Sequence, residues 1–234
     1  MERKYNVGFT LIELSIVLVI IGLIVGGVLV GQSLIEAAQI RAQISQIEKY
    51  KTAANTFRVK FGYLPGDISS GASGNAAANG LFFETTLGGN RGHGDQNGLI
   101  EGGSAGGTLP LGESLVFWRH LSDANLIDGA FGSSGSNAIN PANGNTMGGV
   151  TASNVFQSLP TAKIGKNNYL IVYAVSNFNY YHLLPVVGFG GTGYGGGSTG
   201  LTPIEAYQID SKIDDGQPNS GAVIAAGIGG PMRC

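Results

Sequence analysis

A long apolar run behind a short charged leader constrains the fold of this chain most. Residues 9–31 contain a single charged side chain, Glu13, among apolar residues, glycines and two small hydroxyl residues. A helix of this length spans about 35 Å, enough to cross the hydrocarbon core of a bilayer, which is about 30 Å thick. The run therefore predicts a membrane-spanning helix. Arg3 and Lys4 directly precede it, so the positive-inside tendency predicts a cytoplasmic N-terminus and an exported remainder.

Glu13 is the unusual residue of this predicted span. A carboxylate in the hydrocarbon region costs about 3 kcal/mol even on lenient insertion scales, so an acid there usually has a partner. Cleavage of the chain after Gly8 would release the amine of Phe9 within reach of Glu13, or of the same residue in a neighbouring subunit. Such a cut would create the counter-charge that Glu13 lacks, which makes Glu13 a candidate functional residue.

Taken together, the charged leader, Gly8, Phe9, residues 10–13 and the apolar helix resemble the class III signal of type IV prepilins and pseudopilins. The resemblance implies that a prepilin peptidase in the membrane cleaves after Gly8 and methylates Phe9. It also implies that Glu13 neutralises the Phe9 amine of a neighbour during filament assembly. The partners it implies are this peptidase, other pilin or pseudopilin subunits, an inner-membrane assembly platform and membrane lipid.

The same resemblance gives an expected location. The precursor would lie in the bacterial inner membrane, crossing it once with its head in the periplasm, and would then enter a pilus or pseudopilus. An ordinary secretory signal has an apolar core of about 7–15 residues before a small-residue cleavage site. This run is longer and lacks such a site. A plain single-span anchor explains the apolar run but not the combination of Gly8, Phe9 and Glu13.

Beyond the span, the apolar residues recur at spacings of three and four, which predicts an amphipathic continuation of the same helix. One helix over residues 9–61 is expected, ended by Gly62 and the Pro65-Gly66 pair. Its first part would anchor the chain in the membrane, and its second part would form the spine of a globular head. The apolar stripe of this second part consists of Ile40, Ile44, Ile47, Tyr50, Ala54, Phe57 and Phe61.

Three parts of the chain follow from this organisation: a leader at 1–8, the anchor and spine helix at 9–62, and a head at 63–234. We expect an α+β fold in which a small, mostly antiparallel sheet covers the amphipathic face of the long helix. The head would contain a loop over 64–110, helices over 112–125 and 202–213, and strands over 155–159, 162–164, 169–176, 182–189 and 222–226.

Two groups of acidic and amide residues are candidate calcium sites. In the first, Asp95, Asn97 and Glu101 surround a glycine as in the middle of an EF-hand loop. The match is partial because His93 takes the first ligand position, where an acid is required. A plain Asx-rich turn explains the same residues.

The second group is Asp210, Asp214 and Asp215. A spacing of four places the first two carboxylates on one helix face, where they repel unless a cation or a basic residue intervenes. Some pseudopilins use calcium in place of a disulfide in this region, and here Cys234 is the only cysteine, so no disulfide can form within the chain. Calcium is thus the one cofactor expected, with ordinary solvation of the helix end as the alternative.

Composition and motifs argue against other classes of protein. Only 12% of residues are charged, with 13 basic and 15 acidic side chains, which argues against electrostatic binding of nucleic acid. Residues 188–193 satisfy G-x-G-x-x-G, but a Gly/Ser run follows where a dinucleotide-binding fold needs a helix. His93, His120 and His182 lack metal-ligand spacing, and we expect His120 to be structural. The chain is therefore not expected to be an enzyme.

These observations predict a structural subunit of a filament. A surface pilus, serving adhesion, motility or DNA uptake, and a type II secretion pseudopilus both fit, and the residues do not separate them. The alternative from another class is a membrane-anchored module that binds carbohydrate or another surface and uses a pilin-type anchor.

Overall fold

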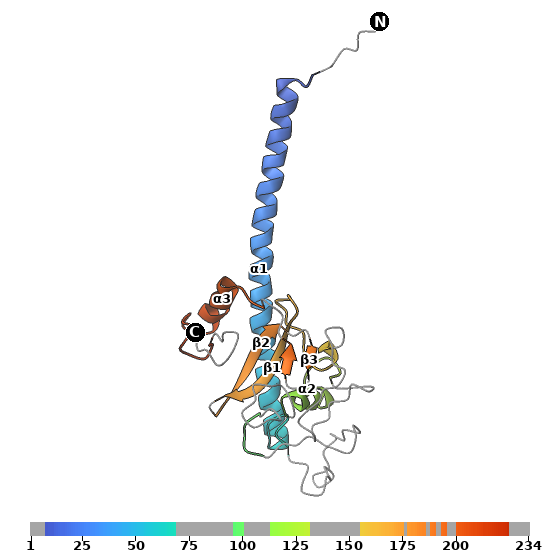
Figure 1. Cartoon of the computed structure of the whole chain (residues 1–234), viewed down its shortest axis with the longest axis vertical. Coiled ribbons are helices and arrows are strands. Elements are labelled where there is room, and N and C mark those ends of the chain that lie inside the picture. The colour runs from blue at the N-terminus through green and yellow to red at the C-terminus, as the bar shows by residue number, and fades with distance from the viewer. Residues whose placement is uncertain are drawn as a thin grey trace.

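A computed structural model describes residues 8–68, 96–100, 113–131, 155–175, 177–185, 188–190, 193–195 and 200–224. One long helix, α1 (Leu11–Phe61), dominates its shape. The N-terminal part of α1 stands clear of every other labelled element, and the head gathers around its C-terminal part (Figure 1). With the two-stranded antiparallel sheet of the head, this arrangement confirms the predicted α+β fold.

The two ends of α1 are fixed by local sequence. Thr10 is the N-cap, in an extended conformation, and the helix begins two residues after the predicted start. At the other end Gly62 adopts a left-handed conformation with a φ of 83°, and its N–H donates to the carbonyl oxygen of Arg58 at 2.8 Å. Such a cap favours glycine because it lacks a Cβ, so the predicted end at Phe61 is confirmed.

Burial along α1 changes abruptly near its middle. All side chains from Leu11 to Val30 are exposed, and Ile40 is the first buried residue. From there a stripe faces the head, with Ile44, Ile47 and Phe61 of the predicted stripe partly buried. The buried residues on this side of the helix are Ile40, Gln43, Gln46, Tyr50, Ala53, Ala54 and Phe57. The prediction of one helix with an apolar first part and an amphipathic second part is confirmed.

The sheet is a hairpin of β1 (Asn168–Val175) and β2 (Phe178–Pro185), paired antiparallel with Val175 opposite Phe178. Asn177 in the connecting turn has a φ of 66°, a conformation that asparagine tolerates better than most residues. The β1 residues Leu170 and Ile171 are fully buried. A second, very short hairpin pairs β3 (Gly188–Gly190) with β4 (Gly193–Gly195), so the G-x-G-x-x-G segment lies in a hairpin.

Two of the predicted strands are wrong. Residues 155–159 form a 3₁₀ turn, η3 (Val155–Gln157), closed by N–H groups of Ser158 and Leu159 that donate to the carbonyl oxygen of Val155. Residues 162–164 form an irregular turn, preceded by one isolated bridge between Thr161 and Tyr169. Val155, Leu159, Ala162 and Ile164 are buried although they lie in turns, whereas Phe156 is exposed.

Other strand boundaries also differ from the prediction. The strand expected over 182–189 begins earlier, at Phe178, because the tight turn after β1 returns the chain at once, and it ends at Pro185. Proline has no N–H to extend the ladder. Residues 222–224 are irregular where a strand was expected, and 225–226 lie outside the described residues. Residues 64–68 and 96–100 contain neither helix nor strand, as expected for these parts of the 64–110 loop.

The two predicted helices of the head are confirmed as α2 (Glu113–Asp123) and α3 (Pro203–Ile213). In α2, Trp118 and Leu121 are fully buried, as predicted. They pack with the α1 stripe and β1 in the main apolar core. In α3, Ile209 packs with Ile40 of α1 and Ile164 in a smaller apolar cluster where the head begins.

Candidate processing and assembly site

The N-terminal end of α1 is organised by a capping box. One oxygen of Glu13, Oε2, accepts hydrogen bonds from the backbone N–H of Thr10 at 2.7 Å and from its hydroxyl at 2.8 Å. In return the N–H of Glu13 donates to the Thr10 hydroxyl oxygen at 3.3 Å. Sequence analysis missed this contact, although Thr followed three residues later by Glu before an apolar run is the usual signature of a capping box.

Both bonds from Thr10 converge on the same carboxylate oxygen. Among the described residues, Oε1 of Glu13 has no partner. The capping box therefore fixes the direction of the side chain and leaves one charged oxygen exposed at the start of the helix.

The residues around the predicted cleavage point are accessible. Phe9 is 84% exposed, and a Cβ built on Gly8 meets no atom within 4 Å. Neither residue is in a helix. A short extended segment that no other described element covers can enter the cleft of a protease.

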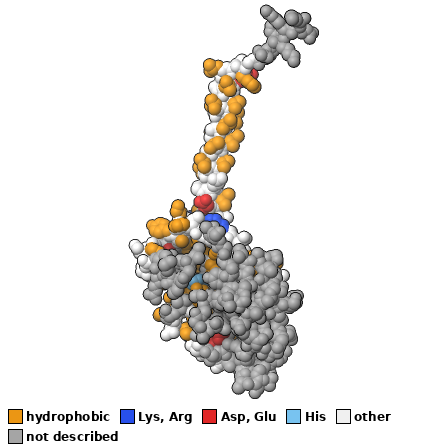
Figure 2. Space-filling view, viewed as in Figure 1, with side chains coloured by type: hydrophobic (Ala, Val, Ile, Leu, Met, Phe, Trp, Pro, Cys, Tyr) orange, Lys and Arg blue, Asp and Glu red, His pale blue; other side chains and the backbone are white. Residues whose placement is uncertain are grey.

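The apolar part of α1 offers a surface that the described head does not cover. The helix is long and apolar enough to cross a membrane, and its most apolar stretch is entirely exposed. Figure 2 shows hydrophobic side chains along this part of the helix, with a negative group near its free end. Apolar surface of this extent requires lipid or other apolar helices to cover it.

The three carboxylates of the second predicted calcium site lie close together at the C-terminal end of α3. Asp210, Asp214 and Asp215 can each supply an oxygen so that all three lie within 4.8 Å of one another. Asp210 is 5% exposed, and its Oδ1 is buried without a hydrogen-bond partner among the described residues.

The other two carboxylates of this group are exposed and bind the following loop. Asp214 accepts a hydrogen bond from the N–H of Ala222. Asp215 accepts from the N–H of Gln217 at 2.8 Å and from the Ser220 hydroxyl at 2.6 Å, the Ser220 bond first among the causes that lower its pKa. These bonds fold residues 214–222 back over the end of α3, around carboxylate oxygens of the kind that calcium prefers.

The other predicted calcium group is not assembled within the described residues. Asp95 and Glu101 lie outside them, and the side-chain oxygen of Asn97 accepts from the N–H of Leu99 at 2.6 Å, as in an Asx turn. Sequence analysis missed the carboxylate that organises this turn, Asp67. It is buried and accepts from the N–H groups of Gln96 and Gly98 at 2.6 and 2.8 Å. Because these partners are far apart in sequence, no local pattern indicated the contact.

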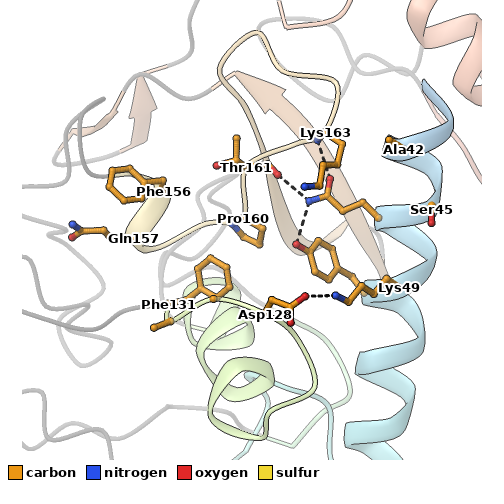
Figure 3. Close-up of a pocket in the computed structure, with 14 residues that line it drawn as sticks. Ala42, Ser45, Lys49, Asp128, Phe131, Phe156, Gln157, Pro160, Thr161 and Lys163 are labelled. Atoms are coloured by element: carbon orange, nitrogen blue, oxygen red, sulfur yellow. Dashed lines mark hydrogen bonds and ion pairs between the residues drawn. The ribbon is translucent and has the colours of Figure 1, made fainter. Parts of the chain in front are cut away.

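A pocket of about 710 Å³ opens beside the head-facing part of α1 (Figure 3). The Gln46 amide nitrogen donates to the Thr161 carbonyl at 2.9 Å and to the Tyr50 hydroxyl at 3.2 Å, and its oxygen accepts from the Lys163 N–H at 3.0 Å. Lys49 and Asp128 form an ion pair at the pocket. The hydrogen bond between them raises the pKa of Lys49 and lowers the pKa of Asp128. The buried Phe131 and the largely exposed Phe156 also line the pocket.

Of two histidines in the head, His120 is buried and His182 is partly buried. Burial lowers the pKa of His120 to about 3, so the ring is neutral, and its Nδ1 accepts a hydrogen bond from the N–H of Gly66 at 2.9 Å. The ring stacks on Phe57. Burial also lowers the pKa of His182 to about 4, and its Nδ1 lies 3.1 Å from the Tyr173 hydroxyl. His120 is structural, as expected.

Comparison with known proteins gives one match. Residues 3–29 match the model of the prokaryotic N-terminal methylation motif. No curated protein and no solved structure is similar enough to the chain to be matched. The matched residues include the predicted cleavage point, the capping box and most of the apolar part of α1. The chain thus carries the N-terminal methylation motif, and the predicted resemblance to type IV prepilins and pseudopilins is confirmed.

Proposed function

We propose that this protein is a structural subunit of a type IV pilus-like filament or of a type II secretion pseudopilus. The observation that carries the proposal is that the methylation motif continues into one helix, α1, whose first part is apolar and exposed and whose second part packs against the head. The motif and the exposed apolar part of α1 support a membrane-anchored precursor. The buried stripe that follows supports a head held rigidly on the same helix.

Processing and assembly would both act on the first residues of the motif. Cleavage after Gly8 by prepilin peptidase would create a Phe9 amine, which the same enzyme would methylate. That amine would be positively charged, opposite to the Glu13 carboxylate, whose exposed Oε1 the Thr10 capping box holds in place. In a filament the amine of one subunit would pair with Glu13 of a neighbour, and the apolar parts of their helices would pack together.

The partners and location follow from this proposal. The precursor would cross the inner membrane once, with its head in the periplasm, and would move laterally in the lipid until an assembly platform extracts it. The filament subunits around it would then replace lipid as the cover of the exposed apolar side chains of α1. The protein acts in this scheme by assembly, not by catalysis.

Intact mass and N-terminal sequence of the protein isolated from its native membrane test the processing step. We expect a chain that begins at N-methylated Phe9. An added Cβ meets no atom at Gly8 or at Gly22, so neither substitution should disturb the fold. The variant Gly8→Val should accumulate with an intact leader because it changes the residue before the proposed cleavage point. The variant Gly22→Ala should be processed normally. A chain that keeps Met1, or one cut after Gly31, would contradict the proposal.

Location separates the two filament systems. If the protein is recovered in filaments sheared from the cell surface, it is a pilus subunit. If it stays with the cell envelope and its loss blocks release of secreted proteins, it is a pseudopilus subunit.

The pocket beside α1 is the observation that favours the second candidate, a membrane-anchored module that binds carbohydrate. The exposed ring of Phe156 can stack on a sugar face, next to the polar groups of Lys163 and Thr161. Binding of the detergent-solubilised protein to an array of glycans tests this function. A signal that Phe156→Ala removes while filament incorporation persists would support it, and an empty array would contradict it.

We also propose that Asp210, Asp214 and Asp215 bind calcium and so hold the C-terminal loop. The unpartnered buried oxygen of Asp210 supports this proposal, since a buried carboxylate oxygen without a partner is costly and a cation would satisfy it. A ligand at a hundred times its dissociation constant stabilises a fold by about 2.7 kcal/mol. Thermal unfolding with and without calcium should show such a gain in the natural protein and in Asp123→Asn, but not in Asp210→Asn. An equal response of all three would contradict the site.

A further inference from the structure

We propose that the exposed face of α3 rests in the headgroup layer of the bilayer that α1 spans, as a second membrane contact of the precursor. This inference rests on the membrane anchoring proposed above. It assigns a ligand, phospholipid at the boundary between headgroups and acyl chains, to a surface of the head that the anchor helix does not use.

The surface consists of two apolar side chains on the outer face of α3. Ile204 is 68% exposed and Tyr207 is 59% exposed. They are three residues apart and therefore lie on one side of the helix. The opposite side carries Ile209, which packs with Ile40 of α1 and with Ile164 of the head. The exposed pair thus faces away from both.

α3 lies on the membrane side of the head (Figure 1). In Figure 1, α3 is the element of the head nearest the bare part of α1. In Figure 2, hydrophobic side chains gather over the same shoulder, beside the point where α1 enters the head. The apolar surface of α3 is therefore close to the apolar surface of the span, not on the far side of the head.

The distance along α1 fits a contact with the headgroups. Ile40, against which α3 packs, is nine residues beyond Gly31 and so about 14 Å beyond the hydrocarbon edge. The radius of α3 with its side chains removes about 5–6 Å of this gap. A span tilted by about 20° lowers a helix packed 8–10 Å from its axis by roughly 3 Å more. The remaining gap is about 5 Å, within the headgroup layer of about 5–7 Å on each side.

Rigid attachment of α3 keeps the face in position. Thr202 and Glu205 form a capping box, and the Lys166 ammonium donates to both oxygens of Glu205 at 2.7 and 2.8 Å. Desolvation opposes ionisation of Glu205, but the bonds from Lys166 and Thr202 outweigh it and lower the pKa of the carboxyl group. The one acid in the first turn of α3 is thus neutralised by a partner and turned away from the exposed face.

The composition of the face favours lipid over water as its partner. Tyrosine is enriched at both membrane interfaces, where its ring lies among apolar chain segments and its hydroxyl reaches the headgroups. Isoleucine beside it supplies apolar area to be buried at the same depth. The anchor holds this face next to the bilayer for as long as the subunit is a membrane monomer.

Depth-dependent fluorescence quenching tests the contact on the full chain in phospholipid vesicles. Tyr207→Trp places a probe on α3, and Leu18→Trp places one in the middle of the span. The natural Trp118 is fully buried and gives the common background. We expect lipids brominated near the headgroup to quench Tyr207→Trp several-fold more than lipids brominated deep in the chain, and the reverse for Leu18→Trp. Adding Ile204→Asp should reduce the quenching of the Tyr207→Trp probe.

The two controls separate the possible failures. If Leu18→Trp is quenched and Tyr207→Trp is not, the span is inserted but α3 does not touch lipid, and the inference is wrong. If neither probe is quenched, the proposed membrane anchoring itself is wrong. A Tyr207→Trp probe that is shielded only after filaments form would show that a neighbouring subunit, not lipid, covers the face, and would also overturn the inference.

Discussion

The two parts of α1 are one continuous helix with opposite surroundings. Side chains from Leu11 to Val30 are all exposed, whereas Ile40 and Phe57 are almost completely buried. The backbone hardly distinguishes the two parts, because both are helical without interruption. The comparison teaches that the pattern of apolar residues on a helix indicates what covers it. The part of α1 that is apolar on all sides requires lipid or other helices, and the part with an apolar stripe packs against the head of the same chain.

Removal of a large side chain should affect the two parts very differently. Phe57→Ala should lower the free energy of unfolding of the head by about 3–5 kcal/mol, because it empties a site in the packed core. Leu18→Ala should leave that free energy unchanged. Chemical unfolding of the full chain in detergent, followed by the fluorescence of the buried Trp118, measures both.

A neighbour on the same turn provides the matched control. Val59 is 88% exposed although it lies two residues from Phe57. Val59→Ala should behave like Leu18→Ala. If Val59→Ala also destabilised the head strongly, burial would not be what distinguishes the two parts of α1.

Substitution of Glu13 should show the reverse preference, affecting assembly and not the head. Glu13→Ala removes both the charge and the capping box, and we expect its incorporation into filaments to fall about tenfold or more. Quantitative immunoblots of purified filaments against total membrane protein measure the ratio. Unfolding of the head should not change, since Glu13 contacts no residue of the described head.

Two further variants distinguish the charge from the cap. Glu13→Gln keeps the reciprocal hydrogen bonds of a capping box and removes only the charge. Thr10→Ala removes the cap and keeps the charge. If the charge pairs with the Phe9 amine, Glu13→Gln should fail like Glu13→Ala and Thr10→Ala should assemble. The opposite ranking would make helix capping the main role of Glu13.

The sequence predicted best what depends on local pattern. The ends of α1, the span of α2 and the start of α3 follow from caps and from helical periodicity, and the structure agrees within two residues or fewer. The failures concern segments whose apolar residues are buried by the rest of the fold. Val155 and Ile164 lie in turns, although the short apolar segments that contain them are typical of strands.

Contacts between distant segments were beyond any local pattern. The hydrogen bonds that Asp67 accepts from the backbone of Gln96 and Gly98 span about thirty residues. Lys166, in the turn before β1, donates a hydrogen bond to Glu205 of α3. The Thr10 capping box was local and could have been recognised.

Acid should weaken the head through His120 and His182 and leave the apolar part of α1 unaffected. His120 has a pKa of about 3 in the folded state, against an ordinary value of 6.5. Below pH 6.5 the unfolded state binds a proton that the folded state does not, so stability is fully present above that pH and falls by about 1.4 kcal/mol per pH unit below it. His182, with a pKa of about 4, adds to the effect in the same direction.

The variant His120→Asn tests the source of this slope. Its side-chain oxygen can still accept a hydrogen bond from the N–H of Gly66, which now donates to His120 Nδ1. Stability between pH 7 and 5 should then depend less steeply on pH than in the natural protein. An unchanged slope would mean that other groups, not His120, set the acid response.

The smallest effects should come from the two ion pairs that join the head to its helices. Lys49 and Asp128 are both largely exposed, whereas the Glu205 side chain that pairs with Lys166 is 12% exposed. Lys166→Met should lower the stability of the head by about 1 kcal/mol, since it leaves a mostly desolvated carboxylate without its partner. Lys49→Met should cause no measurable change, because water and salt screen both members of an exposed pair. Thermal unfolding at low and at high salt separates the two pairs. A stronger loss in Lys49→Met than in Lys166→Met would show that the contact of α1 with the loop after α2, and not the attachment of α3, secures the head on its helix.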